Sequence, residues 1–282
     1  MLNNTMMNIR IDKHLLDALR EDITNEDIST NAIIREKKDG KANLLCKENG
    51  ILAGIQVFKR VFELLGEIHF QTKFKDGDAI KKGDIIATLA GDLRIIMSGE
   101  RTALNYLQHM SGIATYTNEF VNILEGSGVK LLDTRKTTPN MRIFEKYAVK
   151  VGGGINHRFN LSDGILLKDN HIKAAGGVKK AIELVREYTP FARNIEVEVE
   201  NIPMVKEALE AGADIIMLDN MDIESIKQAV KIIDKRAIIE CSGNITKGEL
   251  YEISNTGVDY VSAGVITHSA PPLDFSLNLN QQ

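Results

Sequence analysis

Positively charged side chains gather in one segment of an otherwise acidic chain. Residues 130–173 contain nine Lys and Arg against four Asp and Glu, whereas the 282 residues together carry a formal charge of −4. A solvated helix face would mix the two signs. Arg135, Lys136, Arg158 and Lys168 stand beside glycines or at the ends of apolar runs, where side chains tend to converge. We therefore expect this segment to bind a small, highly charged anion.

Carboxylates end two further apolar runs. The run "IEVEVEN" places Glu196, Glu198 and Glu200 on one face of a strand, because strand side chains alternate with a period of two. The run "DIIMLDN" ends in Asp219 and Asn220. Mg²⁺ prefers one or two carboxylates together with substrate phosphate oxygens and water. Glu198 and Asp219 are therefore candidate magnesium ligands, although composition alone does not rank the three glutamates.

Small polar groups end the last two apolar runs. They are Ser242, Gly243 and Asn244 in "AIIECSGN", and Ser262, Ala263 and Gly264 in "VDYVSAG". Glycine lets backbone N–H groups approach a phosphate closely, and β/α barrels often bind phosphate after their last two strands. Either group taken singly could be an ordinary turn. The loop "VGGGINHR" has neither GxGxxG spacing nor a Walker lysine, so it indicates no Rossmann or P-loop site.

The elements that must position these residues alternate in type. Six apolar runs of strand length are separated by helical segments, and this pattern indicates parallel βαβ units. The runs are "VKLLDT", "GILLKDN", "IEVEVEN", "DIIMLDN", "AIIECSGN" and "VDYVSAG". Six strands favour a barrel with fewer than the usual eight, and an open doubly wound sheet is the alternative. In a barrel, the polar residues at the carboxyl ends of the strands would line one site.

The first hundred residues indicate a separate mixture of helices and antiparallel strands. Their patterns predict a helix at 11–23, a hairpin at 40–54 turning at Asn49-Gly50, a helix at 58–68, short strands within 69–92 and a long helix capped by Ser98.

The bulk composition excludes several classes of protein. A hydrophobic content of 43% is ample for a core, and a pI near 5.9 argues against general nucleic-acid binding. Cys46 and Cys241 make no disulfide framework and lack metal-ligand spacing, and we expect Cys241 to be buried. The first residues contain no apolar signal core, and no run is long enough to span a membrane. We therefore expect a cytoplasmic protein that binds neither membranes nor nucleic acid.

Other charged residues have ordinary structural interpretations. His157 and His171 could be hydrogen-bonded barrel histidines rather than metal ligands. Arg142, Lys146 and Lys150 share a helical segment and are expected on its exposed face.

Eight motifs resemble one family of phosphoribosyltransferases. They are "GERTALNYLQHMSGIAT", "DTRKTTP", "EKYAVKVGGGINHR", "DGILLKDNHI", "EVEVE", "IMLDN", "ECSGNI" and "GVDYVSAGVITHS". In this order they resemble the quinolinate phosphoribosyltransferases, also called carboxylating nicotinate-nucleotide pyrophosphorylases, over nearly the whole chain. The chain departs from the family pattern at Asn25, Glu26 and "PNMR", where no catalytic residue is expected.

The resemblance implies an α/β fold in which an N-terminal α+β sandwich domain (1–112) is joined to an incomplete (β/α) barrel (113–270). It also implies that the tail, 271–282, returns to the first domain. It further implies a homodimer, with a hexamer as the alternative, in which Arg101 of one chain would reach the site of its neighbour.

The resemblance also assigns roles within the site. Catalytic roles fall to Lys136, Lys168, Glu198 and Asp219. The substrate-binding residues would be Arg101, Thr134, Arg135, Lys136, His157, Arg158, Lys168, Glu198, Asp219, Ser242, Gly243, Asn244, Ser262, Ala263 and Gly264. Mg²⁺ is the implied cofactor, held by Glu198 and Asp219 partly through substrate and water.

The implied reaction joins quinolinate to phosphoribosyl pyrophosphate with loss of a carboxylate. Its products are nicotinate mononucleotide, pyrophosphate and carbon dioxide, a step of de novo NAD biosynthesis. Both substrates are polyanions, which agrees with the cationic segment. Three alternatives stay open: a paralogous barrel with a different acceptor, such as the molybdenum-transport-associated relative; a Schiff-base enzyme using Lys168; and a phosphate-binding regulatory barrel without enzymatic activity.

Overall fold

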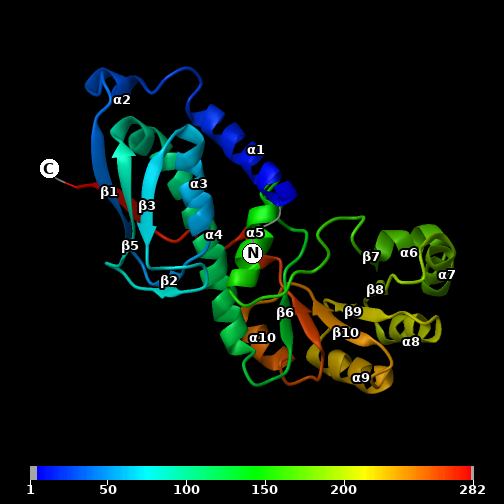
Figure 1. Ribbon diagram of the computed structural model, residues 1–282. Helices are drawn as coiled ribbons and strands as arrows, with labels where there is room; N and C mark the ends of the chain where they lie inside the picture. The colour runs from blue at the N-terminus through cyan, green and yellow to red at the C-terminus, as the bar shows by residue number, and fades with distance from the viewer. Residues whose placement is uncertain (1–4, 281–282) are drawn as a thin grey trace. The chain divides into compact units, whose positions relative to one another are not determined.

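A computed structural model describes residues 5–280 of the chain, with side chains from Arg10 onward (Figure 1). It divides into two compact units. The first contains residues 1–115 and 270–282, and the second contains residues 116–269.

An antiparallel sheet forms the framework of the first unit. Its strands, in the order β12-β1-β5-β3, are β12 (Phe275–Leu279), β1 (Asp39–Cys46), β5 (Ile85–Asp92) and β3 (Ile68–Thr72). Strand β12 pairs with β1 from Ala42 to Cys46, so the end of the chain lies in this unit.

The predicted hairpin at 40–54 is wrong. Strand β2 (Gly50–Ile51) pairs with β4 (Ala79–Ile80), whereas β1 pairs with β5 and β12. The side chain of Asn49 accepts a hydrogen bond from the backbone N–H of Lys82, at 2.9 Å. This bond ties the expected turn to the segment before β5 rather than folding it back onto β1.

Within the described residues, four helices belong to the first unit, and one of them packs on the sheet through an aromatic contact. They are α1 (Thr5–Asp22), α2 (Ile28–Ile33), α3 (Ile55–Leu65) and the first part of α4 (Leu93–Ile123). Phe58 of α3 meets Phe62 edge-on at 5.1 Å between ring centroids and lies 6.3 Å from Phe70 of β3. Such pairs add to the stabilisation from burial alone.

Helix α4 begins five residues before the predicted cap, Ser98. The carboxylate of Asp92, at the end of β5, accepts a hydrogen bond from the backbone N–H of Arg94 at 3.0 Å and so satisfies a donor of the first turn. The hydroxyl of Ser98 instead donates to Asp27, the N-cap of α2, at 2.9 Å. Ser98 therefore lies inside α4 and does not cap it, although serine is a residue type typical of N-caps.

Six parallel strands form the sheet of the second unit. They are β6 (Lys130–Leu132), β7 (Ile165–Leu167), β8 (Ile195–Val199), β9 (Ile215–Asp219), β10 (Ile238–Ser242) and β11 (Tyr260–Ser262). All six coincide with the apolar runs predicted from the sequence. Hydrophobic residues at their centres, such as Val197, Ile216 and Val261, are fully buried.

The strand order identifies an incomplete barrel. From β7 to β11 each strand lies beside the next one in the chain, and β6 closes the far side against β11. A doubly wound sheet would reverse direction at a switch point, and this order does not. Strands β6 and β7 are the two edges of the sheet, and a single bridge from Leu132 to Ile155 extends β6 at that opening.

The helices of the second unit follow its strands. They are α5 (Arg142–Val151), α6 (Asp169–Ala175), α7 (Val178–Tyr188), α8 (Ile202–Glu210), α9 (Ile223–Ile233), α10 (Lys247–Ile253) and α11 (Val265–His268). Asn201, Asp222 and Thr246 cap three of them by accepting backbone N–H groups. Between residues 5 and 280, no helix is both long enough and apolar enough to cross a membrane.

Candidate active site

A cavity of about 370 Å³ opens at the carboxyl ends of the barrel strands. Its lining comes entirely from the second unit. The lining residues are Thr134, Arg135, Lys136, His157, Arg158, Leu166, Lys168, Glu198, Met217, Asp219, Asn220, Glu240, Ser242, Gly243, Asn244, Ser262 and Gly264.

The structure brings together nearly all the predicted site residues. Two do not line the cavity. Ala263 is 1% exposed, and its backbone N–H donates to the carbonyl of Leu132, so it holds β11 beside β6. Arg101 lies on α4 in the first unit, where it is exposed.

Four lining residues have no role in the predicted site, although two of them are polar residues near the ends of the predicted strands. They are Leu166, Met217, Asn220 and Glu240. A signal was available for Glu240, because it stands two residues before Ser242 on the same strand and hence on the same face. Asn220 directly follows Asp219 at one strand end, whereas the two apolar residues resemble ordinary core positions.

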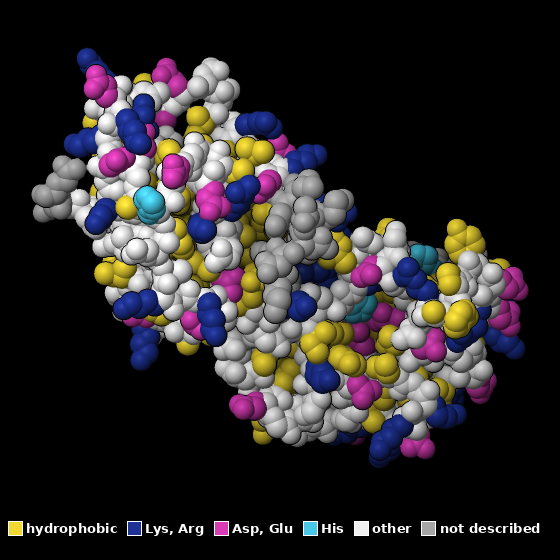
Figure 2. Space-filling view, viewed as in Figure 1, with side chains coloured by type: hydrophobic (Ala, Val, Ile, Leu, Met, Phe, Trp, Pro, Cys, Tyr) yellow, Lys and Arg dark blue, Asp and Glu magenta, His cyan; other side chains and the backbone are white. Residues whose placement is uncertain are grey.

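Two guanidinium groups in the cavity have no acidic partner. Among the residues that the structure describes, neither Arg135 nor Arg158 forms an ion pair. Burial and the nearby charge of Arg135 lower the pKa of Arg158, and the charge of Glu196, which forms no ion pair with it, opposes them only in part. On the face shown in Figure 2, by contrast, Lys and Arg side chains are interspersed with Asp and Glu. Unpaired like charges side by side are suited to an anion that carries more than one negative charge.

The same cavity carries carboxylates on β8 and β9. Glu198 forms an ion pair with Lys168, and Asp219 accepts a hydrogen bond from the side-chain amide of Asn220 at 2.7 Å. The second oxygen of each carboxylate has no protein partner within the described part of the chain. Two carboxylates with such oxygens fit Mg²⁺ in its usual protein sites, where phosphate and water supply the other ligands.

A buried histidine–carboxylate cluster forms part of the cavity wall, because His157 and Glu240 both line the cavity. Nε2 of His157 lies 3.1 Å from Glu196 and 3.4 Å from Glu240. Burial lowers the pKa of His157, but hydrogen bonds and charge from the two glutamates outweigh it and raise the pKa to about 10. Burial also raises the pKa of Glu196. The carboxylates and the ring thus form one compact buried polar group, in which His157 is held close to two glutamates.

The geometry of this cluster argues against a metal centre. The ligand atoms lie within 4.8 Å of one another, a spacing that could hold an ion. However, Nδ1 of His157 accepts the backbone N–H of Arg158 at 2.7 Å. With Nδ1 as an acceptor, Nε2 carries the ring proton and cannot ligate a metal. The doubly protonated ring that a raised pKa favours also carries a proton on Nε2, so neither form of His157 offers this nitrogen to a metal.

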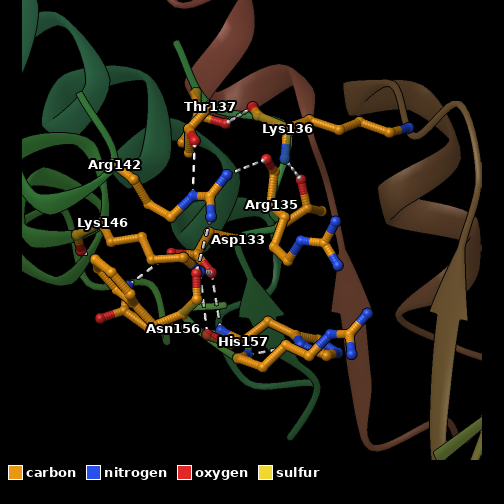
Figure 3. A network of polar contacts seen from close by, with 12 residues as sticks. Asp133, Arg135, Lys136, Thr137, Arg142, Lys146, Asn156 and His157 are labelled. Carbon is orange, nitrogen blue, oxygen red and sulfur yellow. Dashed lines mark hydrogen bonds and ion pairs between the residues drawn. The ribbon is translucent and has the colours of Figure 1, made fainter. Parts of the chain in front are cut away.

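A buried ion pair anchors the loop that carries His157 and Arg158 (Figure 3). Asp133 is fully buried and pairs with Lys146, which is 2% exposed. Asp133 accepts the backbone N–H of His157 at 2.8 Å, and Lys146 donates to the carbonyl of His157 at 3.0 Å. Asn156 donates to Asp133 at 2.7 Å. The prediction that Lys146 lies on an exposed face is wrong, because its helix turns this side chain toward Asp133.

Arg142 and His171 also differ from simple surface residues. Arg142 is half-buried and donates into two loops, which contradicts its predicted place on an exposed face, whereas Lys150 is exposed as predicted. His171 is exposed, and its Nδ1 accepts the backbone N–H of Lys168 at the start of α6.

The loop after β10 requires glycine at its centre. Gly243 has a φ of 147°, and a Cβ placed there would lie 2.8 Å from the side-chain oxygen of Asn220. The absence of a side chain leaves its backbone accessible from the cavity, as a phosphate loop needs. Cys241, just before this loop, is 2% exposed, and burial raises the pKa of its thiol to about 12, so it is no nucleophile.

The fold and the cavity define a class: β/α-barrel proteins that bind polyanions at the carboxyl ends of their strands. Within that class, residues 27–111 match the quinolinate phosphoribosyl transferase N-terminal domain and residues 113–278 match the C-terminal domain. The chain belongs to the quinolinate phosphoribosyl transferase family.

Individual relatives agree with this assignment. A Bacillus subtilis protein named as a probable carboxylating nicotinate-nucleotide pyrophosphorylase is 42% identical over 97% of this chain and 95% of its own length. A mitochondrial quinolinate phosphoribosyltransferase of Nicotiana tabacum is 39% identical over 94% of this chain and 81% of its own length. The crystal structure of NadC from Streptococcus pyogenes has a TM-score of 0.93 and 52% identity, covering 97% of this chain and 98% of that one.

Proposed function

We propose that the chain transfers the phosphoribosyl group of phosphoribosyl pyrophosphate to quinolinate, with decarboxylation, to give nicotinate mononucleotide, pyrophosphate and carbon dioxide. The observation that carries the proposal is the pair of unpaired guanidiniums, Arg135 and Arg158, in one cavity with Glu198 and Asp219. A cationic wall suits the dicarboxylate acceptor. An acidic wall suits a sugar that becomes positively charged as its leaving group departs.

The residues divide the reaction between them. Arg135 and Arg158 bind the adjacent carboxylates of quinolinate and orient its ring nitrogen toward the anomeric carbon of the donor. As the bond to pyrophosphate breaks, Glu198 and Asp219 stabilise the positive charge on the ribose ring. Loops 242–244 and 262–264 hold the 5-phosphate through small residues. Loss of the 2-carboxylate then leaves its electron pair beside the newly cationic nitrogen, which stabilises it, and a proton replaces the carboxylate.

Mg²⁺ is part of this proposal. When bound, it would neutralise charge on the departing pyrophosphate. Glu198 and Asp219 would hold it, together with oxygens of the donor and water. Lys136, which lines the same cavity and forms no ion pair within the described chain, is placed to bind the leaving group.

The Schiff-base alternative is disfavoured by the surroundings of Lys168. Its ammonium pairs with Glu198, and the side chain as a whole is 46% exposed. A Schiff-base lysine must be neutral to attack a carbonyl, and it is usually desolvated or close to another cation. Lys168 is neither desolvated nor paired with a cation, so it is assigned to binding and charge stabilisation.

We also propose a homodimer in which Arg101 completes the site of the neighbouring chain. In support, Arg101 is exposed and has no ion pair with any described residue. The choice between dimer and hexamer, and the cytoplasmic location, stay predictions.

One assay tests the proposed function. The purified protein is incubated with phosphoribosyl pyrophosphate, Mg²⁺ and either quinolinate or nicotinate, and mononucleotide and carbon dioxide are quantified. We expect turnover of quinolinate with one carbon dioxide per nucleotide, and loss of turnover in Glu198→Ala but not in Lys150→Ala, which alters an exposed residue outside the cavity. Turnover of nicotinate alone, without carbon dioxide, would support a different acceptor.

A further inference from the structure

Arg142, at the start of α5, donates a hydrogen bond from each of its three guanidinium nitrogens to another part of the protein. Nε donates to the hydroxyl of Thr137 at 3.0 Å, Nη1 to the carbonyl of Phe159 at 3.1 Å, and Nη2 to the carbonyl of Arg135 at 3.2 Å. Figure 3 shows this side chain reaching from its helix toward Thr137 and Arg135. Three bonds in one plane fix the acceptors relative to one another, because the guanidinium is rigid.

The three acceptors belong to two loops that line the cavity. Thr137 and Arg135 lie in the loop after β6, whereas Phe159 lies in the loop after α5, directly behind Arg158. Arg142 therefore joins the backbone that carries one unpaired guanidinium to the backbone that carries the other. It does not line the cavity itself.

The hydrogen bonds of Arg142 oppose the repulsion between Arg135 and Arg158. Without ligand, nothing acidic in the described chain pairs with either group, and like charges at short range favour separation of the two loops. One loop is already anchored, since Asp133 and Lys146 hold both backbone polar groups of His157. Asp133 also lies at the base of the loop after β6, and the hydroxyl of Thr267 donates to the carbonyl of Lys136 at 2.8 Å. At Arg135 itself, the bond within the described chain that leads to the backbone behind Arg158 runs through Arg142.

We propose that Arg142 is a positioning residue that sets the separation of Arg135 and Arg158, and so makes the cavity prefer two adjacent carboxylates to one. The inference rests on the proposed function, because it takes the acceptor to be an aromatic dicarboxylate. A single carboxylate can bind either guanidinium, and its affinity does not depend on their spacing. A vicinal pair of carboxylates gains from both only when the spacing is fixed in advance.

The test compares two probes that cannot react, benzene-1,2-dicarboxylate and benzoate. Their dissociation constants are measured by calorimetry on wild type, Arg142→Ala, Arg142→Lys and the control Lys150→Ala, which lies on the same helix but is exposed. In both Arg142 variants we expect dicarboxylate affinity to fall about tenfold and benzoate affinity to change less than about twofold. The KM for phosphoribosyl pyrophosphate should stay within about twofold, and Lys150→Ala should match wild type.

The ratio of the two affinities separates positioning from general damage. Lysine keeps the charge but loses the planar fork, so Arg142→Lys should also lose the preference, and it carries the test if the alanine variant does not fold. An unchanged ratio in a folded Arg142 variant, or an equal loss for both probes, would overturn the inference. The proposed function has its own test. If the wild type prefers the dicarboxylate but does not turn over quinolinate, the proposed function is wrong. Loss of the preference in the Arg142 variants would then still support the positioning role of Arg142.

Discussion

Lys146 and Arg135 are cations of the same segment that differ in burial and in ion pairing. Lys146 is buried against Asp133, whereas Arg135 lines the cavity without a partner. A buried charge without a partner is costly, so Lys146 depends on Asp133 for its place in the fold. A cation that faces a solvated cavity needs no protein partner, because water solvates its charge until a ligand binds. The division between structural and ligand-binding charge is thus made residue by residue.

Breaking the buried pair should destabilise the second unit. Lys146→Met leaves Asp133 without its counterion, and we expect a loss of about 3–5 kcal/mol in unfolding free energy. The chain contains no tryptophan, so urea unfolding is followed by circular dichroism. Asp133→Asn combined with Lys146→Met should recover part of the loss. If the double variant is less stable than Lys146→Met alone, the burial of an unpaired carboxylate is not the cause of the lost stability.

Removing a ligand-binding cation should affect affinity instead. Arg158→Ala removes a guanidinium that meets a carboxylate in a partly buried cavity, so the KM for quinolinate should rise about tenfold or more. The unfolding midpoint should change little, since the side chain makes one backbone hydrogen bond, to Gly164. An unchanged KM would remove Arg158 from the acceptor site.

The strands were predictable from sequence, and with them most of the site. Runs such as "DIIMLDN" alternate with helices, and parallel strands bring their carboxyl ends to one edge, so Asp219 and Ser242 could be placed together. Burial of charge was not predictable in this way. Lys146 and Glu240 depend on partners, Asp133 and His157, that only the folded loops bring close. A helical pattern cannot distinguish a lysine facing water from one facing such a partner.

Helix ends were the least predictable elements. Ser98 has the chemistry of an N-cap, but the helix begins earlier, and Asp27 has the capping role at α2. Hydrogen bonds from the Thr30 hydroxyl and backbone N–H hold the pKa of Asp27 below its ordinary value of 3.8. The stability that Asp27 contributes by being charged is therefore present above that value and is lost as the pH falls through the lower pKa of the folded state.

Capping by Asp27 gives a prediction with a defined pH dependence. Asp27→Ala should destabilise the first unit by about 1 kcal/mol at pH 7, and the difference from wild type should shrink below pH 4. Asp27→Asn, which can still accept the backbone bond but does not titrate, serves as the control. A difference that stays constant down to pH 3 would assign the effect to packing rather than to the carboxylate.

At the scale of the molecule, the two units share one chain but supply different parts of the proposed site. Every residue lining the cavity lies in the second unit, whereas Arg101 lies in the first. If Arg101 serves a neighbouring chain, Arg101→Ala and Glu198→Ala subunits, each inactive alone, should regain activity when mixed. At equal ratio, about a quarter of wild-type sites would be intact in random dimers. No recovery in heterodimers verified by mass would argue for a site within one chain.

The place of β12 in the first unit has a consequence for synthesis. This strand pairs with β1, yet the whole barrel separates the two along the chain. On the ribosome, the edge of β1 therefore stays open while about 230 residues emerge, whereas all six barrel strands are already outside when β12 appears. The unit that begins first is completed last, and a nascent chain stalled before Phe275 would expose an unpaired edge to its neighbours.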